Sequence, residues 1–172
     1  MRRLFTLLAA LVVTLTLRGQ EDPTTLLGAG DRLPHFEVAM TDGSHIRSSE
    51  LEGKVVWITL WASWCPSCRK EFKWLSRSEA FEALTAHPDV LFLPIAREEN
   101  SATVAAWLHK KGYSYRSGVD PTREIYSLFA TEEIPRNLLV APDGTIVSHT
   151  STYSPKALEE LVATANEMLN SK

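Results

Sequence analysis

The sequence predicts an α/β sandwich, in which a mixed central sheet is flanked by helices on both faces. Two strand-like runs, residues 54–61 and 89–96, are rich in apolar residues and enclose a helix-like segment, which is typical of parallel strands joined by a right-handed crossover. Two pairs of shorter strand-like segments are each joined by an Asp-Gly turn and predict antiparallel hairpins. The 172 residues fit one domain of this class.

The first half of the chain supplies one hairpin, the two buried strands and the helices between them. Residues 35–40 alternate weakly and lead into Asp42-Gly43, which suits a tight hairpin turn. A short helical turn or loop then ends at Gly53. The elements expected after it are a strand at 54–61, helix at 69–75 and again at 80–86, and a strand at 89–96.

The second half adds three helices and the second hairpin. Asn100 or Ser101 can cap a helix that ends at Gly112. Asp120-Pro121 is a good cap and first-turn pair for a helix that runs through Leu128. The remaining expected elements are an extended stretch at 113–119, strands at 134–140 and 145–149, and an amphipathic helix that Ser154-Pro155 opens.

The N-terminal segment differs in composition from the rest of the chain. Residues 4–17 carry no charge and follow two arginines, as in a secretory signal peptide, and the run is shorter than the roughly 20 residues that span a bilayer. The run ends in a poor cleavage site, so a membrane anchor through residues 4–17 is the alternative. We expect a signal peptide or membrane anchor at 1–19, a linker at 20–30 and one domain at 31–172.

Composition and charge limit the function classes. Hydrophobic residues make up 44% and charged residues 23% of the chain, as in globular proteins with a buried core. Removal of residues 1–19, which hold three arginines and no acid, would change the formal net charge from −3 to −6. A mildly acidic domain without a basic stripe argues against nucleic acid as a partner.

The two cysteines, Cys65 and Cys68, lie where the first buried strand gives way to a helix. A dithiol that exchanges with substrate disulfides needs an exposed thiolate of low pKa to attack and a second thiol close enough to release the product. The free N–H groups and dipole of a helix N-terminus lower the pKa of a cysteine from ~8.5 to somewhere in ~3.5–7.5. The sequence therefore assigns Cys65 as the nucleophile and Cys68 as the shielded, less acidic resolving thiol.

Two cysteines have other interpretations, namely a structural disulfide, a zinc half-site, a pair of inert thiols and a copper site. A disulfide that closes so small a loop would constrain the unfolded chain little. Zinc normally takes four ligands, and the five histidines include no suitably spaced pair. Copper held by both thiols and a distant histidine is an interpretation that residue counts leave open.

Residues 61–71, WASWCPSCRKE, resemble the W-A-x-W-C-x-x-C active-site segment of thioredoxin-like proteins. With the exported N-terminus, the added hairpin and Ile134-Pro135 ahead of residues 141–144, the chain resembles the TlpA/ResA-like branch of extracytoplasmic thiol-disulfide oxidoreductases over about residues 31–170. The implied fold is a thioredoxin-like α/β sandwich with an N-terminal β-hairpin and an inserted helix and strand. Peroxiredoxins resemble this fold, but their Pro-x-x-x-Thr-x-x-Cys loop has no counterpart before Cys65.

The resemblance implies a substrate-binding surface around the dithiol. Pro135 matches the cis-proline of the family, which packs against the dithiol and leaves the backbone of Ile134 free to pair with an extended substrate. Composition alone would favour a trans bond, since only about 5–6% of X–Pro bonds are cis. Trp64 matches the tryptophan beside the nucleophile, and Pro66 and Ser67 match the dipeptide that tunes the reduction potential.

The resemblance also implies a proton-transfer residue. Glu71 matches a carboxylate that lies near the dithiol, and its spacing of three residues from Cys68 places both on one helix face. A solvated charge paired with neighbouring basic residues is the alternative on spacing alone. Thr59 stands where cytosolic thioredoxins hold a buried aspartate, so acid–base help must come from Glu71 or water.

We therefore expect an exported thiol-disulfide oxidoreductase with Cys65, Cys68 and Glu71 as catalytic residues and with no cofactor or metal beyond the cysteine pair. Its expected partners are disulfide-bearing or dithiol exported proteins and a membrane electron donor, in the periplasm or at the outer face of the inner membrane. We expect it to act as a reductase, and cytochrome c maturation and general disulfide reduction or isomerisation both fit that chemistry. A copper-binding metallochaperone module that uses the same two cysteines is the alternative.

Overall fold

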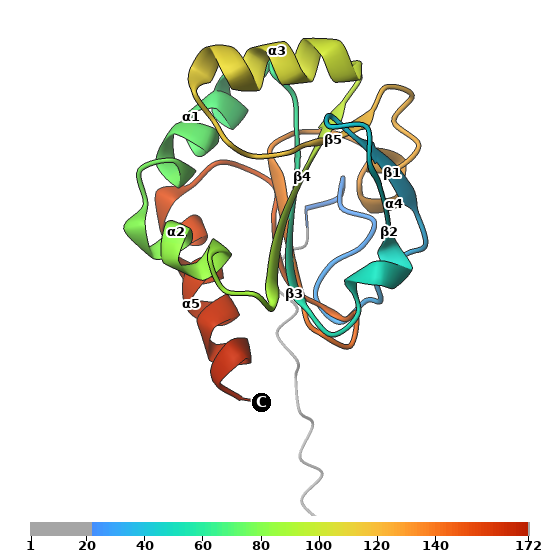
Figure 1. Cartoon of the computed structure of the whole chain (residues 1–172). Coiled ribbons are helices and arrows are strands. Elements are labelled where there is room, and N and C mark those ends of the chain that lie inside the picture. Colours follow the sequence, from blue (N-terminus) through green and yellow to red (C-terminus); the bar gives the residue numbers. More distant parts are fainter. Residues whose placement is uncertain (1–21, 172) are drawn as a thin grey trace, which may run out of the picture.

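The computed structural model describes residues 22–171, which form a seven-stranded sheet with helices on both faces (Figure 1). The elements in chain order are β1 (Glu37–Met40), β2 (His45–Arg47), a 3-10 helix (Ser48–Leu51), β3 (Val55–Trp61), α1 (Pro66–Leu75), α2 (Glu79–Thr85), β4 (Val90–Arg97), α3 (Ser101–Lys111), β5 (Gly118–Asp120), α4 (Tyr126–Phe129), β6 (Arg136–Val140), β7 (Ile146–Thr150) and α5 (Pro155–Asn170). The strands lie in the order β2-β1-β5-β4-β3-β6-β7. The neighbours β5, β4 and β3 are parallel and the other pairs are antiparallel, so the predicted mixed sheet is confirmed.

Strand β3 lies in the middle of the sheet and carries the site at its C-terminal end. All of its residues are buried, because helices cover both faces. Its side chains alternate between two cores, as the strand period requires. Val56 and Ile58 pack in a core with α4 and the 3-10 helix, whereas Val55 and Trp57 pack in a second core with α1, α2 and α5. Figure 1 shows α1, α2 and α5 on one side of the sheet and α4 on the other.

A third core fixes the start of α1 against α3. Trp61, the last residue of β3, lies 4.3 Å from Phe72 of α1 and 5.1 Å from Trp107 of α3, measured between ring centroids. Both cysteines belong to this cluster of buried residues. The first turn of α1 is therefore fixed by aromatic packing on the side away from solvent.

Polar side chains cap three of the helices, and two of these caps, at Asn100 and Ser154, agree with the sequence prediction. The side chains of Ser78, Asn100 and Ser154 accept hydrogen bonds from backbone N–H groups in the first turns of α2, α3 and α5. Helix α3 ends at Gly112, whose φ of 70° is the left-handed conformation that suits glycine.

Two helices begin at other residues than expected. Helix α1 starts at Pro66 rather than three residues later, because Cys65 itself is its N-cap. Helix α4 does not start at Pro121. Asp120 instead ends β5, and its carboxylate accepts a hydrogen bond at 2.7 Å from the N–H of Tyr126, the first residue of α4. Between them Arg123 has a φ of 64°, which is incompatible with a continuous helix.

Residues 22–30 are part of the folded domain, which corrects the expected linker for that stretch. Arg136 is buried, and its guanidinium donates hydrogen bonds to Asp22 at 3.1 Å and to Thr25 at 2.8 Å. The side chain of Thr24 is a further acceptor of this guanidinium. The composition of the segment indicates a loop, but it cannot reveal that a distant arginine holds the loop in place.

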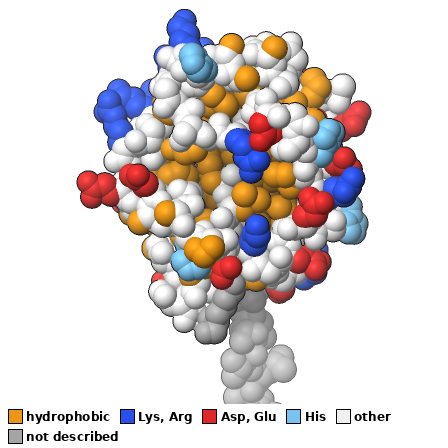
Figure 2. All heavy atoms as spheres, in the orientation of Figure 1, with side chains coloured by type: hydrophobic (Ala, Val, Ile, Leu, Met, Phe, Trp, Pro, Cys, Tyr) orange, Lys and Arg blue, Asp and Glu red, His pale blue; other side chains and the backbone are white. Residues whose placement is uncertain are grey.

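The signal peptide or membrane anchor expected at 1–19 lies outside the described residues. Within residues 22–171, no helix has the length and apolar character to cross a membrane. Figure 2 shows acidic and basic side chains interspersed on the face that it presents, without a continuous basic stripe.

Candidate active site

Cys65 is the N-cap residue of α1. Its sulfur accepts a hydrogen bond at 3.2 Å from the backbone N–H of Cys68, one of the N–H groups that a helix leaves free at its start. Pro66 occupies the first helical position, where its missing N–H costs nothing and its fixed φ suits the helix. The strand–helix junction read from the sequence therefore places the Cys65 sulfur over the positive end of α1.

A hydroxyl and a carbonyl group surround the same sulfur. Ser67 Oγ lies 3.2 Å from Cys65 Sγ, and the Ile134 carbonyl oxygen lies 3.6 Å from it. Ser67 also reaches this carbonyl oxygen at 3.3 Å. The expectation of a free Ile134 backbone is thus corrected for its carbonyl group, which already faces the thiol and the hydroxyl. The Ile134–Pro135 bond is cis, as the resemblance implies.

The two thiols differ strongly in acidity. The hydrogen bond from the Cys68 thiol is the main cause that lowers the pKa of Cys65 from 9.0 to about 6. The Ser67 hydroxyl and the N–H groups of both residues add to it, and burial opposes it. Burial is the main cause that raises the pKa of Cys68 far above its ordinary value, and the negative charges of Cys65 and Glu71 act in the same direction. Cys65 is therefore a thiolate at neutral pH, and Cys68 is a thiol.

Cys65 is less accessible than the sequence suggested. Both cysteines are free thiols, but only 4% of Cys65 is exposed and Cys68 is fully buried. The expected exposed thiolate is therefore corrected to an almost completely buried one, against which Ile134 packs. A substrate sulfur therefore has to reach Cys65 through the small part of this residue that is exposed.

Glu71 lies in the interior rather than on a solvated helix face. It is fully buried, which excludes the solvated-charge interpretation. Burial raises the pKa of its carboxyl group to about 8, and the Cys65 charge adds to the rise, while a hydrogen bond from Asn137 opposes it. One of its oxygens, Oε2, accepts that bond at 3.0 Å, and the other, Oε1, is buried without a hydrogen-bond partner among the described residues.

Asn137 of β6 is a member of the site that the sequence did not reveal. Its carbonyl oxygen accepts hydrogen bonds from Trp57 Nε1 at 2.8 Å and from Thr59 Oγ1 at 2.7 Å. Thr59 therefore contributes a hydroxyl donor to this network. The one available signal was the position of Asn137 two residues after Pro135, with a polar side chain directly before the apolar residues of the strand.

A second polar contact fixes the turn between β3 and α1. The N–H of Ser63 donates to Glu99 Oε2 at 2.6 Å, and the Ser63 hydroxyl donates to the other oxygen of the same carboxylate. The Ser63 carbonyl oxygen accepts a hydrogen bond at 2.7 Å from Arg69 Nε. The turn that leads into Cys65 is thereby tied both to α1 and to the loop after β4.

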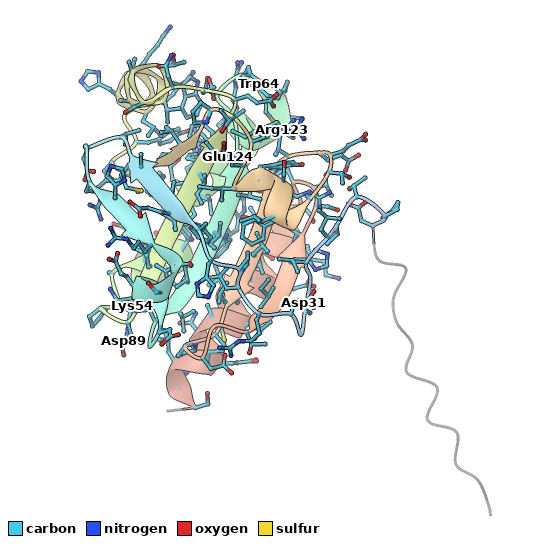
Figure 3. The ribbon with its side chains drawn as sticks, turned by 90° about the vertical axis from the view of Figure 1, so that its right-hand side faces the viewer. Asp31, Lys54, Trp64, Asp89, Arg123 and Glu124 are labelled. Carbon is cyan, nitrogen blue, oxygen red and sulfur yellow. The ribbon has the colours of Figure 1, made fainter. Side chains whose placement is uncertain are left out.

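Trp64 is the exposed aromatic residue of the site, with 49% of its surface open to solvent. The Arg97 guanidinium lies 5.7 Å from the centroid of its ring and 4.5 Å from that of Tyr126. Figure 3 shows Trp64 at the opposite end of the molecule from Lys54 and Asp89, which precede β3 and β4. Trp64 and Pro66, the two chain neighbours of Cys65, are thus both exposed.

Comparison with protein families gives a match to the AhpC/TSA family over residues 29–149. Among curated proteins, the chain is similar to the thiol-disulfide oxidoreductase ResA of Bacillus subtilis, with 25% identity over 122 residues. That alignment covers 70% of this chain and 66% of the relative, so the chain spans about two thirds of its length. ResA of Halalkalibacterium halodurans is 24% identical over 80% of this chain and 77% of that protein.

Solved structures are similar over most of the chain. A solution structure from Bacteroides thetaiotaomicron, described as a protein disulfide isomerase, has a TM-score of 0.79 and 32% identity and covers 86% of this chain and 93% of that one. A secreted disulfide oxidoreductase of Mycobacterium tuberculosis, homologous to DsbE of E. coli, has a TM-score of 0.63 and 22% identity and covers 75% of this chain and 95% of that one. The second likeness concerns the fold alone.

Proposed function

This chain belongs to the AhpC/TSA family and has a thioredoxin-like fold, and on that premise we propose that it is a thiol-disulfide oxidoreductase that exchanges disulfides with other proteins through Cys65 and Cys68. The observation that carries the proposal is the difference in acidity between the two thiols of the dithiol. Cys65 has a pKa of about 6 at a helix N-terminus, and Cys68 is a buried thiol one turn away. Inert thiols have no reason to differ in this way.

The first step is attack by the Cys65 thiolate on a substrate disulfide. A bond forms between Cys65 Sγ and one substrate sulfur, and the other substrate sulfur leaves as a thiolate. The Ser67 hydroxyl, no longer facing a thiolate, can turn to the Ile134 carbonyl oxygen that it already reaches. The product of this step is a mixed disulfide between Cys65 and the substrate.

The second step resolves the mixed disulfide. Cys68 loses its proton and attacks Cys65 Sγ, which releases the second substrate sulfur as a thiolate and leaves a Cys65–Cys68 disulfide. Two electrons pass to the substrate. The Cys65 charge, which raises the pKa of Glu71, vanishes in the mixed disulfide, so Glu71 ionises more readily and becomes a base for the Cys68 proton. Glu71 is therefore catalytic in this proposal.

The direction of exchange and the partners are also part of the proposal. We assign the protein as a reductase of exported proteins outside the cytoplasm, recharged by a membrane electron donor. The names of the ResA relatives support thiol-disulfide exchange, and the signal-like composition of residues 4–17 supports a location outside the cytoplasm. Cytochrome c maturation is one pathway in which such a reductase would serve.

The test is a single turnover. The reduced protein is mixed with a synthetic peptide disulfide, and thiol release is followed together with oxidation of the protein. We expect one peptide disulfide reduced for each Cys65–Cys68 disulfide formed, and no reaction with Cys65→Ser. A folded native protein that releases no peptide thiol would overturn the proposal. Equilibration with glutathione then gives the direction, since a couple more reducing than glutathione supports a reductase.

The copper metallochaperone is tested on the same protein. Within residues 22–171, no three His, Cys, Asp or Glu side chains are grouped to hold a metal ion, and a copper site would rest on the two sulfurs alone. Titration of the reduced protein with Cu(I) measures this directly. Tight copper binding together with no peptide reduction would replace the oxidoreductase proposal.

A further inference from the structure

The amide group of Asn137 has a fixed orientation. An indole N–H can only donate, so the Asn137 atom that faces Trp57 Nε1 has to be the carbonyl oxygen. The amide nitrogen therefore points the other way, toward Glu71 Oε2 at 3.0 Å and Thr150 Oγ1 at 3.2 Å. Trp57 and Thr59 on β3 thus decide which end of Asn137 meets Glu71.

This orientation distinguishes the two oxygens of Glu71. Because Asn137 Nδ2 donates to Oε2, that oxygen is an acceptor, and a neutral Glu71 has to carry its proton on Oε1. Oε1 is the oxygen that is buried without a hydrogen-bond partner among the described residues. A buried, unpartnered polar atom is costly, and such atoms call for a functional explanation.

We infer that Asn137 is a positioning residue for proton transfer: it occupies Oε2 and so makes Oε1 the atom at which Glu71 takes up and releases the proton of the dithiol. The inference rests on the proposed function, because it requires Glu71 to serve the resolving step. No electrons move in this transfer. The proton leaves Cys68 Sγ for Oε1 as the resolving thiolate forms, and later passes to the released substrate thiolate or to water.

The surroundings of Glu71 contain few groups that could compete for this role. Strand β3 presents Trp57 and Thr59, β6 presents Asn137 and β7 presents Thr150, and none of these titrates near neutral pH. The titratable groups coupled to Glu71 are Cys65 and Cys68 on α1. No described lysine, arginine or histidine forms an ion pair with Glu71.

The experiment follows the titration of the Glu71 carboxyl carbon by NMR in the reduced chain. Asn137→Asp keeps the shape and the acceptor for Trp57 but replaces the donor to Oε2 with a second carboxyl oxygen. Two carboxyl groups in contact cannot both ionise easily, so the higher apparent midpoint of the pair should rise by about one pH unit or more. Thr150→Val is the matched control, because it removes the second hydrogen-bond partner of Asn137 Nδ2 and leaves the hydrogen bond to Glu71. In this variant the titration midpoint of Glu71 should not change.

The Trp57 indole N–H resonance reports folding in every variant, and it should shift with the Glu71 midpoint because Asn137 links the two side chains. Resolution of a mixed disulfide at neutral pH should be at least several-fold slower in Asn137→Asp than in Thr150→Val. The inference would be overturned by an unchanged Glu71 midpoint in folded Asn137→Asp, or by equal resolution rates in the two variants. The proposed function would still stand in that case, provided that the native chain reduces the peptide disulfide. If the native chain reduces no peptide, both fail.

Discussion

Ser67 illustrates how a single side chain sets the chemistry of the dithiol. Its hydroxyl lies 3.2 Å from Cys65 Sγ and is one of the groups that lower the pKa of this thiol. Because the thiolate is the reactive form, the native protein should react with alkylating agents at a rate that rises through pH 6 rather than near the ordinary pKa of cysteine.

Replacement of Ser67 by alanine should move this profile to higher pH. The thiolate loses a hydrogen-bond donor, so its protonated form gains relative stability and the pKa of Cys65 rises, by roughly one unit. The pH dependence of alkylation rate measures the shift. Ser76→Ala, which removes a hydroxyl bonded to the Lys73 carbonyl on the same helix, should leave the profile unchanged. Equal midpoints in both variants would show that Ser67 has no part in the acidity of Cys65.

At the scale of elements, β5 contains a position at which the sheet is closely packed. Gly118 pairs with Met40 of β1 and Ile95 of β4. A Cβ atom at this position would lie 2.4 Å from Val38 Cγ2 and 3.3 Å from Ile95 Cγ1, and both of those side chains are buried. The glycine therefore lets β1 and its hairpin join the parallel part of the sheet.

Gly118→Ala should lower the free energy of unfolding by about 1–3 kcal/mol, the usual cost of overpacking a core. Denaturant unfolding measures this loss. Because the clash is with Val38, the double variant with Val38→Ala should lose less stability than the two single losses combined. Additive losses would mean that the space beside Val38 does not limit this position.

Sequence patterns predicted the elements well where neighbouring residues determine the local structure. They failed where a hydrogen bond with a residue farther away in the chain determines it. The apolar run of β3, the polar caps and the Asp-Gly turns each follow from neighbouring residues. Helix α4 was expected too early because Asp120, a good cap by composition, belongs to β5 and caps the helix from six residues away. The segment 22–30 was expected to be a linker because Arg136 is more than a hundred residues away in the chain.

At the scale of the whole molecule, the site joins three parts of the chain. The dithiol comes from the β3–α1 junction, the carbonyl group beside it from Ile134, and the hydrogen-bond donor to Glu71 from Asn137 on β6. The sequence predicts the first part by spacing, and the second by resemblance. The third could not be predicted, because the hydrogen bond to Glu71 comes from a residue 66 positions later that only the fold brings near.

The ordered pair of thiols is the central claim, and trapping of mixed disulfides tests it most directly. Each cysteine is replaced by serine in turn, and the whole chain is incubated with disulfide-bearing exported proteins. Cys68→Ser should accumulate mixed disulfides through Cys65, because the attacking thiolate is retained and the resolving thiol is lost. Cys65→Ser should accumulate none, because Cys68 is buried and remains protonated. Equal trapping by both variants, or trapping by Cys65→Ser alone, would contradict the assignment.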